Sequence, residues 1–357
     1  MAATPPAQDA LEDARAAGLV YTSDRQPGIR RVRRGAGFRY VGADGAALRD
    51  RDELARIRAL AVPPAWREVW ICRSPRGHVQ ATGRDARGRK QYRYHARFRA
   101  MRDANKYARM IAFGEALPRL REQIQRDLSR EGLPREKVLA TVVRLLRITA
   151  MRVGNEEYRR ENRSYGLTTL RSTQVEVAGG RLEFHFRGKS GKEHVVGVED
   201  PRLARVVRRC QELPGQELFQ YVDADGTRQA VGSSEVNDYV RGATGEGFTA
   251  KDFRTWHASA IAAGALRDLG PARTEREAGR KVKRALERVA AALGNTPAVC
   301  RTSYVHPAAV EAFLDRSLFA IRARRARSGD LDADERLLLA LLRHRERAER
   351  SRLRRAA

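Results

Sequence analysis

The segment from Leu293 to Pro307 contains Tyr304. Its sequence neighbours suggest that the phenol is accessible for a reaction and is not simply packed in a core. Gly294 suits the C-terminus of a helix and Pro297 cannot continue one, so the segment predicts a sharp turn and then a short helix that carries Tyr304. A phenol there would face solvent and could attack a phosphate. An ordinary tyrosine at the rim of a core fits the same pattern, and this segment alone does not separate the two.

Arg152 lies where a buried apolar helix meets a glycine turn. A charge at such a place is costly unless an anion pairs with it. The anion would be the carboxylate of Glu156 or Glu157, or a bound phosphate. The residues leave both options open.

Lys251 and Arg254 stand one turn apart on a predicted helix that Thr249 caps. Two cations at this spacing repel each other, which is tolerable when an anion lies between them. Trp256 and the alanine-rich run at 258–263 on the same helix are expected to pack the core.

A proton donor is predicted at the hairpin Gly188–Lys192, which joins two expected strands. A lysine at a hairpin tip projects from a rigid base and can deliver a proton to a leaving group. Most hairpin lysines simply lie in water. Spacing alone does not choose between Lys189 and Lys192.

Basic residues, glycines and aromatic residues alternate in the stretch GRDARGRKQYRYH, residues 83–95. Arginine and lysine can bind phosphates there, glutamine can reach a base edge or sugar, and tyrosine can pack on a nucleic-acid backbone. A solvated basic hairpin is the alternative. The high overall charge favours DNA contacts from Arg84, Arg87, Arg89, Lys90, Gln91 and Tyr92.

The net charge of +27, from 71 Lys and Arg against 44 Asp and Glu, predicts a polyanionic partner such as nucleic acid. Neither an amphipathic anchor nor a lipidation signal favours a membrane. Cys72, Cys210 and Cys300 match no zinc or disulfide spacing, so no metal site is expected. A signal peptide is not apparent, and we expect a cytoplasmic, nucleoid-associated protein.

The helices and strands expected around these residues indicate an α+β fold. We expect a small antiparallel sheet domain, with a helix capped by Asp50, before a larger and mainly helical catalytic domain that contains a three-stranded sheet near 174–198. Two helices separated at Pro118 should lie between 97 and 130, and a leucine-rich helix should cover 334–345. The predicted division is a flexible segment 1–18, a DNA-clamping sheet domain 19–95, a catalytic domain 96–320, and a C-terminal helix and basic tail 321–357.

Five stretches in order resemble the type IB DNA topoisomerases of the small bacterial and poxvirus-like group, which share their catalytic domain with tyrosine recombinases. They are GRDARGRKQY (83–92), ENRSYGLTTL (161–170), FRGK (186–189), TAKDFRT (249–255) and LGNTPAVCRTSY (293–304). The resemblance covers about residues 20–320. It implies relaxation of supercoiled double-stranded DNA through a 3′-phosphotyrosyl intermediate, by a monomer that needs no ATP, metal, other cofactor or obligatory protein partner.

The resemblance also implies roles for individual residues. Tyr304 would be the nucleophile, and Arg152 and Arg254 would hold the scissile phosphate. Lys189 takes the position of the general acid, which decides against Lys192.

One position departs from many relatives. Asn295 stands nine residues before Tyr304, where viral and eukaryotic enzymes carry histidine. An amide can donate a hydrogen bond to phosphate but cannot carry charge or shuttle a proton. His257 and His306 do not occupy the motif position, and Lys251 matches a further basic position near the phosphate.

Three other functions compete with this interpretation. A tyrosine recombinase usually has His-x-x-Arg where this chain has Lys251 to Arg254, and it lacks a sheet domain of this kind. An architectural DNA-binding protein would keep the charge without using the five-part pattern. A metal-dependent nuclease would lose activity in EDTA.

Overall fold

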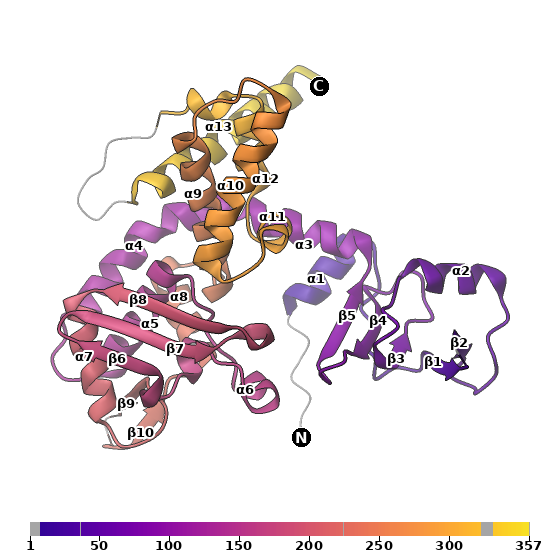
Figure 1. Cartoon of the computed structure of the whole chain (residues 1–357), viewed down its shortest axis with the longest axis horizontal. Coiled ribbons are helices and arrows are strands. Elements are labelled where there is room, and N and C mark those ends of the chain that lie inside the picture. The colour runs from indigo at the N-terminus through magenta and orange to yellow at the C-terminus, as the bar shows by residue number, and fades with distance from the viewer. Residues whose placement is uncertain (1–7, 36, 224, 323–330, 357) are drawn as a thin grey trace. The chain divides into compact units, whose positions relative to one another are not determined.

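The computed structural model describes residues 8–35, 37–223, 225–322 and 331–356 (Figure 1). The chain forms two compact units, residues 1–108 and 109–357. The predicted α+β class is confirmed, since an antiparallel sheet comes first and a mainly helical region with a small sheet follows. Residues 1–7 of the predicted flexible segment lie outside the described residues.

The first unit is built on a five-stranded antiparallel sheet in the order β2-β1-β3-β4-β5. Ile29, Val69, Ile71 and Ala81 of the sheet and Ile57 of a helix form its apolar core. The strands are β1 (Ile29–Arg34), β2 (Gly37–Val41), β3 (Arg67–Ile71), β4 (Val79–Arg84) and β5 (Lys90–Tyr94), and the helices are α1 (Gln8–Ala16), α2 (Arg51–Ala59) and α3 (Ala96–Ala108).

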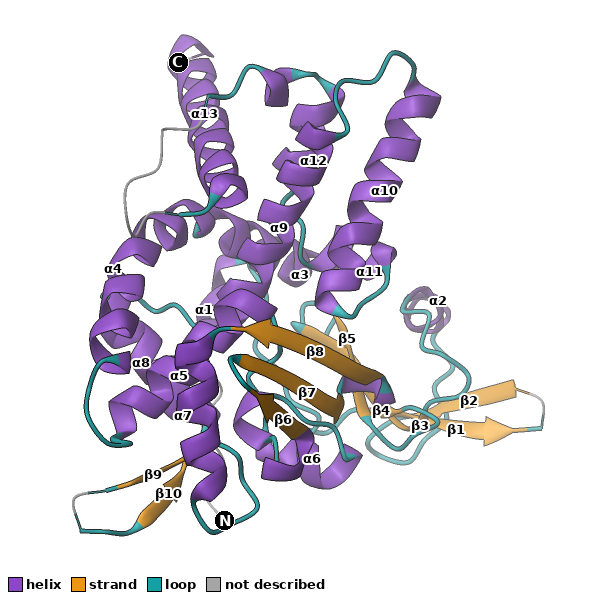
Figure 2. Ribbon diagram, turned by 60° about the vertical axis from the view of Figure 1, so that its left-hand side comes forward, coloured by secondary structure: helices purple, strands orange, loops and turns teal. Residues whose placement is uncertain are grey.

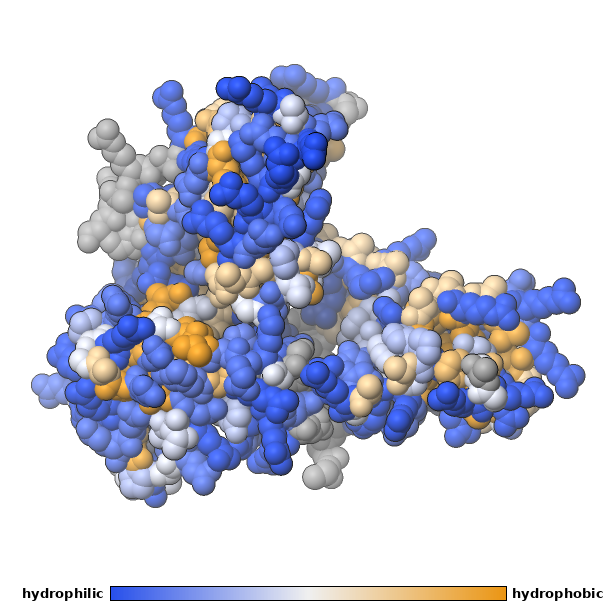
Figure 3. All heavy atoms as spheres, in the orientation of Figure 1, coloured by the Kyte–Doolittle hydropathy of each residue, from blue (hydrophilic) through white to orange (hydrophobic). Residues whose placement is uncertain are grey.

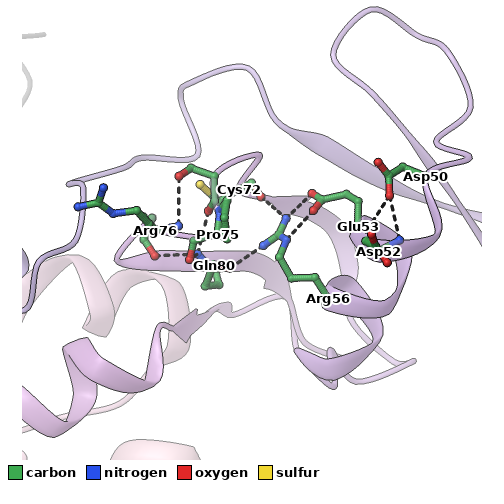
Figure 4. Close-up of polar contacts among 10 residues, drawn as sticks. Asp50, Asp52, Glu53, Arg56, Cys72, Pro75, Arg76 and Gln80 are labelled. Atoms are coloured by element: carbon green, nitrogen blue, oxygen red, sulfur yellow. Dashed lines mark hydrogen bonds and ion pairs between the residues drawn. The ribbon is translucent and has the colours of Figure 1, made fainter.

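A polar network attaches α2 to the β3–β4 hairpin (Figure 4). Asp50 caps α2 as predicted, because its carboxylate accepts the backbone N–H groups of the first turn. Arg56 binds Glu53, the Gln80 amide oxygen at 2.6 Å and the Cys72 carbonyl at 2.7 Å. The buried Gln80 amide nitrogen in turn lies within hydrogen-bond distance of the carbonyls of Ser74, Pro75 and Gly77.

The second unit is mainly helical, with two small sheets (Figure 2). Its three-stranded antiparallel sheet has the order β6-β7-β8, as predicted. The helices are α4 (Met110–Leu128), α5 (Arg135–Thr149), α6 (Glu156–Asn162), α7 (Pro201–Glu212), α8 (Ser233–Thr244), α9 (Ala250–Asp268), α10 (Glu275–Leu293), α11 (Pro297–Ser303), α12 (Pro307–Leu314) and α13 (Ala333–Ala356). The strands are β6 (Val175–Ala178), β7 (Arg181–Arg187), β8 (Glu193–Glu199), β9 (Gln220–Val222) and β10 (Arg228–Ala230).

Helix α9 lies at the centre of this unit and packs against α4, α5, α10, α12 and α13. Its alanines are buried on several sides, which lets the neighbouring backbones approach closely. Trp256 and most of the alanine-rich run at 258–263 are in the core, as predicted. The helix also begins at the predicted cap, because the Thr249 hydroxyl accepts the N–H of Lys251.

The predicted helix break at Pro118 is wrong. Helix α4 runs through Pro118, and the break falls at Arg109, between α3 and α4. A proline inside a helix removes one hydrogen bond to the carbonyl four residues earlier, here Gly114. Apolar side chains buried on both sides of the proline, including Phe113 and Leu120, hold the helix together despite that loss.

The predicted leucine-rich helix is confirmed as α13, and it extends to Ala356, so the described end of the basic tail is also helical. Leu337, Leu338, Leu341 and Leu342 are buried. No helix among the described residues combines the length and apolar character needed to cross a membrane. The described part of the chain also contains no group of three or more His, Cys, Asp or Glu side chains arranged to bind a metal.

Candidate active site

Tyr304 follows directly after α11 and lies half-buried in the second unit. Gly294 ends α10 with a φ of 63°, and Thr296 caps α11, whose first residue is Pro297, so the predicted turn and short helix are confirmed. The phenol differs from the expectation of a solvent-facing group. It packs against the apolar core that α9, α10 and α12 share, where the adjacent Val305 is buried.

The buried Ser259 hydroxyl of α9 contacts the backbone on both sides of Val305. Its oxygen accepts the backbone N–H of His306 at 2.9 Å and lies 3.2 Å from the carbonyl oxygen of Tyr304. The His306 side chain caps α12 by accepting the N–H of Ala308. These contacts fix the chain direction at the tyrosine, and they give His306 a structural role.

Arg254 is 6% exposed and connects two helix ends near Tyr304. Its guanidinium donates to the carbonyl of Ala150 at the end of α5 and to that of Leu293 at the end of α10. The guanidinium carbon lies 5.1 Å from the centre of the Tyr304 ring. Lys251, one turn earlier on α9, is exposed, so the two cations of this helix lie in different environments.

Arg152 reaches Asn295, 143 positions later in the chain. Its Nη2 donates to the Asn295 amide oxygen at 3.2 Å, while the amide nitrogen is buried without a partner among the described residues. Glu156 pairs with Arg159 instead, so it is not the anion of Arg152. The side chain of Glu157 lies outside the description.

The ENRSYGLTTL stretch supports the Arg152 loop through its backbone. Leu167 donates to the carbonyl of Arg152 at 2.9 Å, and Thr168 donates to that of Val153 at 2.7 Å. A Cβ on Gly166 would lie 2.6 Å from the Arg152 carbonyl oxygen, so only glycine fits at this crossing. The stretch therefore holds Arg152 in place.

Lys189 begins a short 3-10 turn, Lys189–Gly191, at the tip of the β7–β8 hairpin. Lys189 and Lys192 are both exposed, and neither forms an ion pair with another described residue. The structure thus brings together Tyr304, Arg152, Arg254 and Asn295, and it shows no contact between Lys189 and this group among the described side chains.

His194 is a residue that sequence reasoning missed. It lines a pocket of about 260 Å³ together with Arg152 and Arg254. His194 lies on β8 and pairs with Phe186 of β7. The alternation of residues along the two strands indicates this pairing, but it does not show that two arginines lie nearby. Burial, followed by the positive charges of Arg152, Lys192 and Arg254, lowers the pKa of His194 below its ordinary 6.5.

The charges around Tyr304 favour its ionised form. Burial by itself would raise the pKa of Tyr304, but the charges of Arg254 and Arg152 and their hydrogen bonding outweigh it and hold the pKa below 10.0. The pKa of Arg254 is also lowered, by burial and by the charge of Arg152. An anion bound at these guanidiniums would relieve their mutual repulsion.

The basic hairpin of the first unit has internal partners. Asp85 accepts hydrogen bonds from the backbone of Arg87 and Arg89 and from the side chains of Arg89 and Gln91. These contacts, led by the Arg89 side chain, lower the pKa of Asp85 to about 2. Tyr92 is 46% exposed. Arg84 and Lys90 are also predicted to contact DNA. Arg84 forms an ion pair with Glu68, and Lys90 forms one with Asp24.

Comparisons with known proteins agree with the resemblance seen in the sequence. Residues 95–327 match the family described as "Eukaryotic DNA topoisomerase I, catalytic core", and residues 37–85 match "Bacterial DNA topoisomerase IB, N-terminal domain". The chain is 32% identical over 303 residues to DNA topoisomerase 1B of Acanthamoeba polyphaga mimivirus, a match that covers 82% of this chain and 90% of that protein. It is 27% identical over 169 residues to DNA topoisomerase 1 of Schizosaccharomyces pombe, which covers 47% of this chain and 20% of that protein.

The family match includes Tyr304 and the three residues gathered around it, and the match to the viral relative covers most of the chain. The chain therefore belongs to the type IB DNA topoisomerase family and is an isomerase of that family.

Proposed function

We propose that this protein relaxes supercoiled double-stranded DNA by cutting and resealing one strand through a 3′-phosphotyrosyl bond to Tyr304. The observation that supports this most strongly is the half-buried phenol beside the two guanidiniums of Arg152 and Arg254, which lower its pKa. A phenol activated in this way, next to a site for an anion, suits attack on a phosphodiester.

In the first step, the Tyr304 oxygen attacks phosphorus in line, and the bond from phosphorus to the 5′ oxygen breaks. The phenol proton leaves to solvent, and the 5′ oxygen takes a proton from Lys189. The covalent link keeps the energy of the broken bond, so the 5′ hydroxyl can reverse the reaction without ATP. While the strand is open, the free end rotates about the intact strand and supercoils of either sign relax.

The transition state places extra negative charge on the nonbridging oxygens. Arg152 and Arg254 are permanently charged and can hydrogen-bond two oxygens each, which suits them to this charge. The Asn295 amide nitrogen, buried without a partner among the described residues, is a third donor. Each donor contributes on the order of 3 kcal/mol to stabilising the transition state.

Lys189 is the proposed general acid. Its exposed position on a hairpin tip leaves it accessible to a DNA strand, and general acids of this kind accelerate reactions roughly 10²- to 10⁴-fold. It meets the leaving group only when DNA is bound, which fits the absence of contacts between Lys189 and the described arginines of the site.

Duplex DNA contacts the exposed Lys251 and a surface formed by Arg84, Arg87, Arg89, Lys90, Gln91 and Tyr92. The protein acts as a monomer without a cofactor or obligatory protein partner, on nucleoid DNA in the cytoplasm. The sheet domain 19–95 and the catalytic domain 96–320 together clamp the duplex.

Relaxation of negatively supercoiled plasmid in EDTA without ATP tests the reaction. The wild-type protein should relax the plasmid fully, and Tyr304→Phe should bind DNA without relaxing it. On a denaturing gel, a 5′-labelled scissile strand should remain attached to the wild-type protein, while a 3′-labelled fragment is released. An adduct formed by Tyr304→Phe, or retention of the 3′-labelled fragment, contradicts the proposal.

A further inference from the structure

The imidazole of His194 lies between two glycines, each one position before a residue of the proposed site. A Cβ on Gly188 would lie 2.6 Å from the Nε2 and Cδ2 atoms of His194, and a Cβ on Gly294 would lie 2.2 Å from its Cε1 atom. Gly188 precedes Lys189, and Gly294 precedes Asn295. The ring therefore touches the backbone of the hairpin and the backbone of the α10–α11 turn at the same time.

We propose that His194 is a positioning residue that holds the Lys189 hairpin at a set distance from the turn that carries Asn295. This inference rests on the proposed function, because it assigns His194 the task of aligning the general acid. The imidazole itself neither contacts the phosphate nor transfers a proton in this proposal.

The packing suits a rigid spacer. His194 stacks on Phe186 with ring centres 5.2 Å apart and planes 12° apart, which fixes the orientation of the imidazole. Glycine on both sides lets the backbones approach the flat ring without an intervening side chain. Lys189 itself forms no ion pair with another described residue. Its hairpin is linked to the turn before Tyr304 through the contacts of His194 with Gly188 and Gly294.

The charged groups around His194 favour a neutral spacer. Arg152 follows α5, Arg254 lies on α9 and Lys192 lies on the hairpin, while the carboxylate of Glu193 has the opposite effect. Neither ring nitrogen hydrogen-bonds to another described residue. A charged imidazole would add a cation beside two guanidiniums, whereas a neutral one fills the space without that repulsion.

The test compares two substitutions that keep different properties of histidine. His194→Phe keeps a flat ring that stacks on Phe186 but has no nitrogen, and His194→Asn keeps a hydrogen-bonding nitrogen but has no ring. The full-length variants are assayed for single-turnover cleavage of a duplex oligonucleotide and, separately, for DNA affinity. We expect His194→Asn and His194→Ala to cleave about 100-fold slower with unchanged affinity, and His194→Phe to stay within about 10-fold of wild type.

A substrate with sulfur in place of the 5′ bridging oxygen identifies the residue through which His194 acts. A thiolate leaves without a proton, because thiols ionise near pH 8.5, in contrast to alcohols. Lys189→Ala should recover most of its cleavage rate on this substrate, and His194→Ala should recover alongside it. His185→Ala is the matched control, since this exposed histidine pairs with Glu183, and the variant should cleave both substrates at the wild-type rate.

The outcomes separate the possibilities. An active His194→Asn with an inactive but folded His194→Phe would mean that a hydrogen-bonding nitrogen at this position acts directly, and the spacer proposal would be wrong. The spacer proposal would also be wrong if His194→Ala cleaves at the wild-type rate or keeps its full defect on the sulfur substrate. Thermal melting checks folding of each variant. If the wild-type protein forms no adduct on either substrate, the proposed function fails instead.

Discussion

At the scale of single residues, the positive charges of Arg254 and Arg152 act on the pKa of Tyr304. Burial acts against the phenolate, and the positive charges of Arg254 and Arg152 overcome it. Arg254 is held by the carbonyls of Ala150 and Leu293, so its position is built into the fold before any substrate binds. A preorganised cation of this kind does not need to rearrange as charge develops in the transition state.

Removing Arg152 should raise the pKa of Tyr304, because one of the two charges that favour the phenolate is lost. Arg152→Ala should slow single-turnover cleavage about 10²-fold, and the rate should reach its plateau at a higher pH than in the wild type. Arg152→Lys is the control, since it keeps the charge and loses the planar fork. An unchanged pH profile in Arg152→Ala would show that Arg152 does not act on the phenol.

At the scale of elements, α9 organises the second unit through Trp256. The indole packs against Gly114 of α4, and its Nε1 donates to Glu335 of α13 at 3.2 Å. Glu335 is buried and also pairs with Arg121 of α4. One side chain of α9 thus contacts both neighbouring helices, and the same helix carries Arg254 and Ser259 to the tyrosine.

Gly114→Ala should destabilise the second unit by about 2 kcal/mol, because the new methyl group would lie 2.3 Å from the rigid Trp256 ring. Gly279→Ala is the matched control on α10, where an added Cβ meets nothing within 4 Å. That change should stabilise the helix by about 1 kcal/mol. Urea unfolding measures both, and equal effects of the two substitutions would contradict the steric argument.

Glu335→Gln should destabilise the protein by about 3 kcal/mol, since it removes the buried carboxylate that pairs with the guanidinium of Arg121. Burial by itself would raise the pKa of Glu335, but Arg121 and the N–H of Asp332 lower it below 4.5. A lowered carboxylate pKa contributes stability above the unfolded-state pKa, and this contribution disappears as the pH falls through the folded-state pKa. Unfolding free energies should therefore converge for wild type and Glu335→Gln in acid, and a constant difference would contradict this assignment.

At the scale of the whole molecule, positive charge extends over two units with separate cores. Hydrophilic side chains cover most of the surface that Figure 3 shows. The net charge of +27 supports binding through phosphates, which depends on the release of counterions and carries little sequence information.

Duplex affinity should therefore fall steeply with salt. If the protein neutralises six to ten phosphates, binding weakens about 10³- to 10⁵-fold between roughly 50 and 200 mM salt. Filter binding across this range with Tyr304→Phe separates affinity from cleavage. A nearly flat dependence would mean that contacts other than phosphate contacts dominate.

Features that depend on near neighbours in the chain could be predicted from the sequence. Asp50, Thr249 and Gly294 mark helix ends as predicted, because capping is satisfied within a few residues of the same chain segment. The order and spacing of the five motifs were sufficient to indicate the family. The half-buried state of Tyr304 and the continuity of α4 through Pro118 depend instead on packing between segments that are far apart in the chain. The same holds for the contacts that join distant segments.

The Arg152–Asn295 bond spans 143 positions, and His194 meets Gly294 across 100 positions. No local preference encodes such pairs. They form because α5 and α10 both pack against α9, and the end of α5, the β7–β8 hairpin and the turn before Tyr304 line the same pocket.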